Sequence, residues 1–89
     1  MNLGLVRARQ KRYPEAVQMM SRSVEPEVAL NDVGYIAMRQ GDLGVAEIYF
    51  QKAIEVAPRY FEEAQRNLDE LRVRNLAQPK VKYVDNESG

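Results

Sequence analysis

The sequence predicts an all-α fold built from repeated helical hairpins, and three observations carry this prediction. Apolar residues recur at steps of three and four along most of the chain, the spacing that places them on one face of a helix. Proline and glycine stand between these stretches, where helices are expected to begin and end. The chain also matches itself when it is shifted by 30 positions, which indicates an internal repeat.

The apolar periodicity predicts four successive helices, over residues 2–10, 14–24, 26–40 and 45–56. Pro14 and Pro26 suit the first turn of a helix, because the N–H that proline lacks has no partner there. Gly41 and Asp42 are expected to end the third helix, since glycine readily adopts the left-handed conformation that closes a helix.

The self-match pairs glycine with glycine, alanine with alanine and large apolar residues with one another. It superposes Leu3-Gly4 on Val33-Gly34, Arg9-Gln10 on Arg39-Gln40, Ala16 on Ala46 and Met20 on Phe50. Small residues such as Gly34 and Ala46 are expected where two helices approach closely, with larger residues filling the space around them. Each hairpin then leaves an apolar side that a neighbouring unit must bury, so the units should stack into an array.

A spaced set of small and large residues in the second unit carries a family resemblance: Leu30, Val33, Gly34, Ala37, Ala46, Phe50, Ala53 and Pro58. On these residues the chain resembles the tetratricopeptide repeat (TPR) family. The resemblance implies a TPR-like α-α superhelix of about two hairpins plus a C-terminal capping helix. The expected helical domain covers residues 1–76, divided into a short first repeat 1–26, a full repeat 27–60 and a capping helix 60–76.

The capping helix carries apolar residues on one side and charges on the other. The apolar side holds Ala64, Leu68 and Leu71. A charged outer face suits a helix that closes the end of an array. Residues 77–89 are expected to form a flexible tail, although the alternation of lysines and apolar residues in "KVKYV" leaves open an extended segment that docks. Because the first repeat lacks the start of its first helix, we also expect the chain to be a piece of a longer array.

The composition argues against catalysis. The chain has no Cys and no His, which removes thiolate nucleophiles, the commonest metal ligands and the usual general base. Neighbouring carboxylates such as Glu62 and Glu63 diverge by roughly 100° around a helix and do not converge on one substrate atom. Lys and Arg number 13, as do Asp and Glu, so no net charge attracts nucleic acid. We therefore expect a protein that is not an enzyme and has no cofactor, no metal, no nucleic-acid partner and no membrane insertion.

In the TPR family the first helix of each hairpin lines a concave groove. Carried over onto this chain, the groove positions are Asn31, Asp32, Tyr35, Met38 and Arg39 in the full repeat, and Asn2, Leu5, Ala8 and Arg9 in the short one. Arg74 of the capping helix falls in the same register, so Arg9, Arg39 and Arg74 form a possible ladder. Because Arg binds carboxylates bidentately, we expect a partner segment with acidic residues, anchored on Tyr35 and Met38. The alternative, that these arginines are solvated surface, stays open.

The expected function is a non-catalytic module for protein–protein interaction and assembly. The stretches "SVEPEVALNDVGY" and "PRYFEEAQRNL" are also similar to repeats of bacterial tight-adherence (Flp-type) pilus-assembly proteins. This weaker resemblance implies a part in pilus or secretion assembly and a place in the cell envelope or periplasm, whereas the chain as given reads as cytoplasmic. Two alternatives remain: structural self-association as a homodimer, and a secretion chaperone that binds its cargo.

Overall fold

The computed structural model describes residues 3–77, except for the side chains of Leu3, Val6, Arg9 and Ala77. This part of the chain folds into five α-helices: α1 (Leu3–Arg9), α2 (Tyr13–Met20), α3 (Pro26–Arg39), α4 (Leu43–Val56) and α5 (Glu62–Ala77). Because residues 3–77 contain no strand, the all-α prediction is confirmed for them. The expected tail beyond Ala77, like Asn2, lies outside the described residues.

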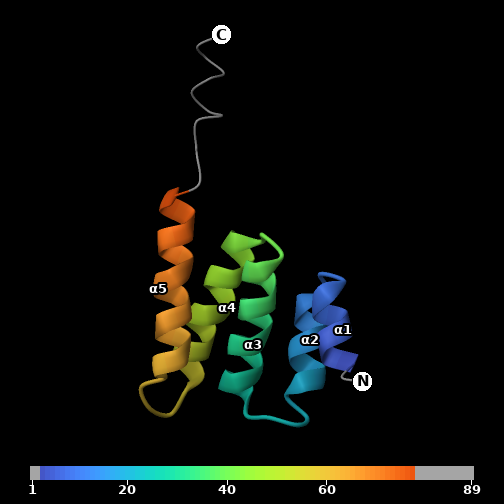
Figure 1. Cartoon of the computed structure of the whole chain (residues 1–89). Coiled ribbons are helices and arrows are strands. Elements are labelled where there is room, and N and C mark those ends of the chain that lie inside the picture. Colours follow the sequence, from blue (N-terminus) through green and yellow to red (C-terminus); the bar gives the residue numbers. More distant parts are fainter. Residues whose placement is uncertain (1–2, 78–89) are drawn as a thin grey trace.

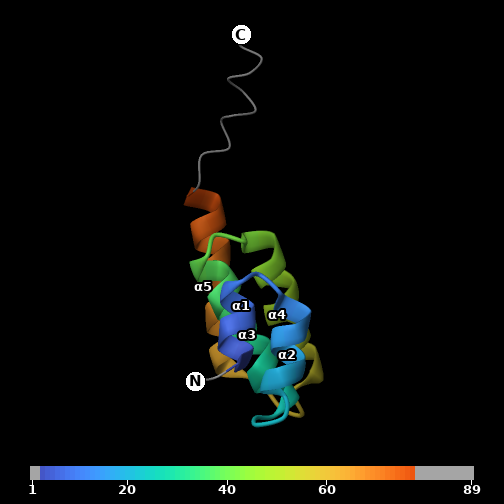
Figure 2. The ribbon, with the colours of Figure 1, turned by 90° about the vertical axis from the view of Figure 1, so that its right-hand side faces the viewer.

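The helices form two layers. Helices α1, α3 and α5 stack in one layer, and α2 and α4 form the other (Figure 2). Consecutive helices pair as hairpins, α1 with α2 and α3 with α4, and the two hairpins stand side by side with α5 at the far end (Figure 1). Helix α3 occupies the centre, since it packs against all four other helices. Within the described range, none of these helices has the length and apolar character needed to cross a membrane.

The second hairpin closes tightly at Gly34. A Cβ atom at this position would lie 2.8 Å from Cε1 of Phe50 and 3.2 Å from Cβ of Tyr49. Only glycine fits here without displacement of the Phe50 ring, which is fully buried. Ala46, also fully buried on the facing helix, leaves room for the same approach. The prediction that small residues permit close packing of these two helices is therefore confirmed.

Both hairpins turn with the same backbone geometry, at positions 30 residues apart in the sequence. Gly41 has φ +88° and Lys11 has φ +65°, so each turn contains one residue in the left-handed region. The amides of the following residues, Arg12 and Asp42, each donate to the carbonyl five residues earlier at 2.9 Å. The sequence repeat is therefore also a repeat of turn structure, although the first turn places a lysine where the second has glycine.

Tyr13 links the first hairpin to the turn of the second. Its hydroxyl donates to Oδ2 of Asp42 at 2.6 Å and accepts from Nε2 of Gln40 at 2.8 Å. The Gln40 amide also donates to the backbone carbonyl of Ala8 at 3.1 Å. Burial, and next the hydrogen bond to Asp42, raise the pKa of Tyr13 to about 12, and the same bond lowers the pKa of Asp42. The rings of Tyr13 and Tyr49 pack in a T-shaped arrangement, with their centroids 6.3 Å apart.

Some helix boundaries differ from the predicted ones. Helix α2 ends at Met20, whereas the periodicity predicted helix to residue 24, and residues 21–24 form a turn. The physical reason is Pro26, which disfavours helical backbone at the preceding Glu25 and leaves that residue extended, with ψ 151°. Helix α4 begins earlier than expected, at Leu43. Helix α5 begins later, at Glu62, and continues one residue into the expected tail.

Candidate functional site

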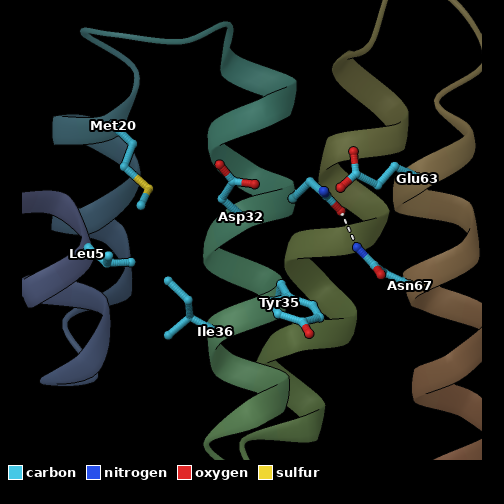
Figure 3. A pocket seen from close by; sticks show the side chains of 8 residues that line it. Leu5, Met20, Asp32, Tyr35, Ile36, Glu63 and Asn67 are labelled. Atoms are coloured by element: carbon cyan, nitrogen blue, oxygen red, sulfur yellow. Dashed lines mark hydrogen bonds between the residues drawn. The ribbon is translucent and has the colours of Figure 1, made fainter. Parts of the chain in front are cut away.

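A groove of about 560 Å³ opens on the layer formed by α1, α3 and α5 (Figure 3). Its lining comes from four helices and consists of Leu5, Met20, Asn31, Asp32, Tyr35, Ile36, Glu63 and Asn67. The volume is in the range of ligand sites in proteins. We refer to the cavity lined by these eight residues as the groove.

One wall of the groove is apolar. Leu5 of α1, Met20 of α2 and Ile36 of α3 lie toward the first hairpin (Figure 3). Leu5 and Ile36 are partly exposed and pack against the buried core, so their inner surfaces are anchored while their outer surfaces remain accessible. An apolar wall with this support presents a fixed surface to a ligand, because its side chains have little freedom to collapse into the cavity.

The other wall is acidic. The carboxylate of Glu63 extends from α5 toward α3, and the carboxylate of Asp32 lies over α3 at the same level of the groove (Figure 3). Burial, and to a lesser extent the negative charge of Glu63, raise the pKa of Asp32 above its usual value. None of the described residues that line the groove is Lys or Arg. The wall therefore holds two carboxylates without a cation among the lining side chains.

An amide pair fixes the two helices that carry these carboxylates. Nδ2 of Asn67 on α5 donates to Oδ1 of Asn31 on α3 at 3.0 Å (Figure 3). Asn31 is only 2% exposed and is the buried polar residue among the otherwise apolar core of residues 3–77. Because Glu63 lies four residues before Asn67, one helical turn places both on the same face of α5. The amide pair thus sets the position of Glu63 relative to Asp32.

A second cavity, of about 370 Å³, adjoins the groove and shares Tyr35 and Ile36 with it. Its other lining residues are Arg39 and Gln40. Nη1 of Arg39 donates to the Tyr35 hydroxyl at 3.2 Å, and the guanidinium carbon lies 5.8 Å from the centre of the Tyr35 ring. This end of the surface therefore combines an aromatic ring with a cation, whereas the groove itself is acidic.

The structure places four of the predicted partner-binding residues in the groove: Leu5, Asn31, Asp32 and Tyr35. Arg39 lines the adjoining cavity instead. Arg74 lines neither of these two cavities, and its Nη2 pairs with Oε2 of Glu70 at 2.9 Å on the same helix. The side chain of Arg9 lies outside the described residues, so the three-arginine ladder stays a prediction.

Two of the predicted groove positions are wrong. Met38 is 1% exposed and Ala8 is fully buried, and neither lines the groove. Asn31 is almost as buried, at 2%, and borders the groove only beneath its bond to Asn67. For Met38 the reason is the central place of α3, which packs against all four other helices, and for Ala8 it is the packing of α1 against both α2 and α3. Ile36, two residues earlier than Met38, is the aliphatic residue of α3 that lines the groove.

The sequence argument missed four lining residues: Met20, Ile36, Glu63 and Asn67. Asn67 had a usable signal, because the register that placed Arg74 beside Arg39 also places Asn67 level with Asp32. Glu63 lies one turn before Asn67 and follows from the same register. Met20 had no such signal, since it lies on the second helix of its hairpin and enters the groove only at the helix end.

Within residues 3–77, no three His, Cys, Asp or Glu side chains gather in a way that would hold a metal ion. Comparisons of the chain with protein-family models, with curated proteins and with solved structures gave no match. The chemistry of the groove is therefore the basis for assigning a function.

Proposed function

We propose that the chain is a non-catalytic protein-binding module, a TPR-like hairpin array that receives a segment of another protein in its groove. One observation carries the proposal: side chains from four helices converge on one cavity that has an apolar wall, an acidic wall and an accessible aromatic residue. Tyr35 is 39% exposed at the centre of this surface and borders both cavities. Aromatic residues in such central positions typically dominate the binding energy of protein interfaces.

The charge of the groove favours a different partner from the one that the sequence suggested. The predicted acidic segment would place its carboxylates beside Asp32 and Glu63, where like charges repel. A segment with a lysine or arginine satisfies this wall instead, and an acidic residue fits only at the Arg39 end. The proposed ligand is therefore an extended or helical segment with a cation and apolar side chains.

Site-specific photo-crosslinking tests this function. A photoreactive amino acid replaces Tyr35 in one variant and Ile48 in a matched control, since Ile48 is 54% exposed on α4 and lines neither cavity. We expect a discrete protein adduct from position 35 and none from position 48. The captured protein is then purified, and its affinity for Tyr35→Ala and Ile48→Ala is measured. We expect Tyr35→Ala to weaken binding by about tenfold or more.

Equal affinity of the two alanine variants, or the absence of an adduct from position 35, would overturn the proposal. The pilus-assembly and secretion-chaperone alternatives are distinguished by the identity of the captured protein: a pilus-assembly component or a secreted cargo. Both uses share the same groove and predict the same effect of Tyr35→Ala.

Self-association is a second candidate, favoured by exposed apolar residues at the end of α5. Val73 and Leu76 lie three residues apart on one face of this helix and are both largely exposed. Light scattering at increasing concentration tests this candidate, with Val73→Glu as the variant. A concentration-dependent dimer that Val73→Glu abolishes supports it, and a strict monomer rules it out.

A further inference from the structure

Four side chains of helix α3 form one stripe along its outer face: Asp32, Tyr35, Ile36 and Arg39. Their spacing places them within about 100° around the helix axis. Each of them lines the groove or the cavity that adjoins it, and none of the four is buried. Figure 3 shows the first three on the side of α3 that faces the groove. We refer to these four residues as the α3 stripe.

The two ends of the α3 stripe carry opposite charges. Asp32 shares its end with Glu63, and neither Lys nor Arg is among the described side chains that line the groove there. Arg39 stands at the other end, about 10 Å along the helix axis, because it follows Asp32 by seven residues. Within residues 3–77, neither Asp32 nor Arg39 forms an ion pair. Both charges are therefore available to a partner.

The α3 stripe is complementary to itself when a second copy runs in the opposite direction. Its four positions are symmetric about the point between Tyr35 and Ile36. A half-turn about an axis through that point and across the helix places Asp32 of each copy opposite Arg39 of the other. The same half-turn places Tyr35 against Ile36. A second copy in the parallel direction would instead bring like charges together, which disfavours association.

The geometry points to a two-fold symmetric dimer in which the α3 stripes of two copies pack antiparallel across the groove. Ion pairs between the copies then neutralise both ends of the stripe, and apolar side chains meet at the two-fold axis. Packed helices lie roughly 8–10 Å apart, a gap that Arg and Asp side chains extended toward each other can bridge. The contact uses the same surface on both copies, so the assembly closes at two chains.

The second copy supplies the chemistry that the groove requires. The groove calls for a cation at its acidic wall and apolar groups beside its apolar wall, and α3 of another copy brings Arg39 and Tyr35. A guanidinium has five N–H donors, so one Arg39 can serve both Asp32 and Glu63. Tyr35 is 39% exposed in the single chain and becomes buried at the centre of the contact. Aromatic residues in this position typically contribute most to an interface.

This contact goes beyond the proposed function, because it needs no other protein. It also differs from the contact considered above for the end of α5, since neither Val73 nor Leu76 lines the groove. The dimer covers Tyr35, so an external partner and the second copy compete for one surface. Because ion pairs at a protein surface contribute little, we expect a dimer of modest affinity that forms as the concentration rises.

Charge reversal along the α3 stripe, followed by sedimentation equilibrium of the full chain, tests the inference. Asp32→Arg and Arg39→Asp each place like charges at both ends of the symmetric contact, so each should weaken dimerisation by about tenfold or more. The double variant, Asp32→Arg with Arg39→Asp, restores opposite charges, and the dimer should return. Lys52→Glu is the matched control, because Lys52 is exposed on α4 and lines neither cavity. It should leave the dimer unchanged.

A mixture of the two single variants separates loss of the contact from loss of folding. The stripe of Asp32→Arg carries two arginines and that of Arg39→Asp carries two aspartates, so an antiparallel pair with one of each has opposite charges at both ends. We expect the mixture to form dimers although neither variant does so alone. Circular dichroism of each variant should show the helix content of the unaltered chain.

A chain that stays monomeric at every concentration would overturn the inference, and so would a dimer that survives either single reversal. Failure of the double variant or of the mixture to regain the dimer would also contradict it. A dimer that Val73→Glu abolishes and Asp32→Arg does not would assign self-association to the end of α5. The proposed function is decided separately, because a crosslinked adduct from position 35 with the mass of two chains reports the dimer, and an adduct of any other mass reports an external partner.

Discussion

The two hairpins share one turn geometry and differ in how they are supported. Helices α3 and α4 are 14 residues each, whereas α1 and α2 have seven and eight. At the position where the second hairpin has Phe50, fully buried, the first has Met20, which is 7% exposed. Helices as short as those of the first hairpin are unstable alone, so their stability comes from packing. From this comparison we expect the second hairpin to be the more stable of the two.

The link at Tyr13 is the clearest sign of this dependence. The equivalent residue of the second hairpin is Leu43, which has no hydroxyl and makes no such bond. Tyr13 instead reaches the second turn and bonds to Asp42 and Gln40. We therefore expect the first hairpin to open locally before the second unfolds.

The largest expected effect comes from the core residue of each hairpin. Phe50→Ala should lower the free energy of unfolding by about 3–5 kcal/mol, because it leaves a large cavity in the centre of the protein. Met20→Ala should cost about 2 kcal/mol, since the side chain is flexible and lies at the edge of the core. Urea unfolding followed by circular dichroism measures both. Equal losses would show that the first hairpin is as well packed as the second.

The next effect concerns the link between the hairpins. Tyr13→Phe keeps the buried ring and removes the hydroxyl, so it should cost about 1–2 kcal/mol for the two lost hydrogen bonds. Hydrogen exchange should become faster for the amides of α1 and α2 and change little for those of α3 and α4. Tyr60→Phe is the matched control, because that side chain is exposed. Uniform acceleration in all helices would contradict the idea of a separately opening first hairpin.

The same contact predicts a dependence on alkaline pH. The pKa of Tyr13 is raised from its ordinary value of 10 to about 12 in the folded protein. Its contribution to stability is fully present below pH 10, and it is lost as the pH rises through about 12. Unfolding experiments between these values should show a decline that is smaller in Tyr13→Phe. The same decline in both proteins would assign it to other groups, such as Tyr49, whose pKa is also raised by burial.

At acid pH the hydrogen bond between Tyr13 and Asp42 affects stability through the ionisation of Asp42. The hydrogen bond from Tyr13 lowers the pKa of this carboxylate, so its contribution is present above the unfolded pKa and is lost as the pH falls through the folded one. In Tyr13→Phe the pKa of Asp42 should rise toward its ordinary value, which carbon-detected NMR of the carboxyl group measures. An unchanged pKa would mean that Lys11, whose Nζ lies 3.5 Å from Oδ2, is the dominant partner.

The sequence was sufficient to predict the helices and the close approach at Gly34, because both follow from local spacing and from the size of side chains. It was also sufficient to place Asp32 and Tyr35 at the groove, through the register of the repeat. It did not predict the burial of Met38, which depends on the number of helices that surround α3. Nor did it predict that the charge of Glu63 acts on Asp32, since these residues belong to helices of different units.

Tyr13 is a second case in which the sequence predicted burial but not the contacts between helices of different units. The repeat register correctly marks Tyr13 as a packing position, and the ring is buried as expected. The register says nothing of its hydroxyl, because Leu43 at the equivalent place offers no polar group for comparison. This interaction between units is made by a residue that differs between the two repeats, so comparing the repeats with each other does not predict it.

The smallest expected effect tests whether the two turns are equivalent. Gly41→Ala should cost about 1 kcal/mol, because alanine at positive φ is strained although the space around it is open. Lys11→Gly should stabilise the protein by about 0.5 kcal/mol, because the relief of strain exceeds the added freedom of the unfolded chain. The exposed ion pair that Lys11 makes with Asp42 contributes little to this difference. Urea midpoints that move in opposite directions support equivalent turns. A loss of stability in Lys11→Gly as large as that in Gly41→Ala would show that lysine supplies more to the first turn than its backbone conformation.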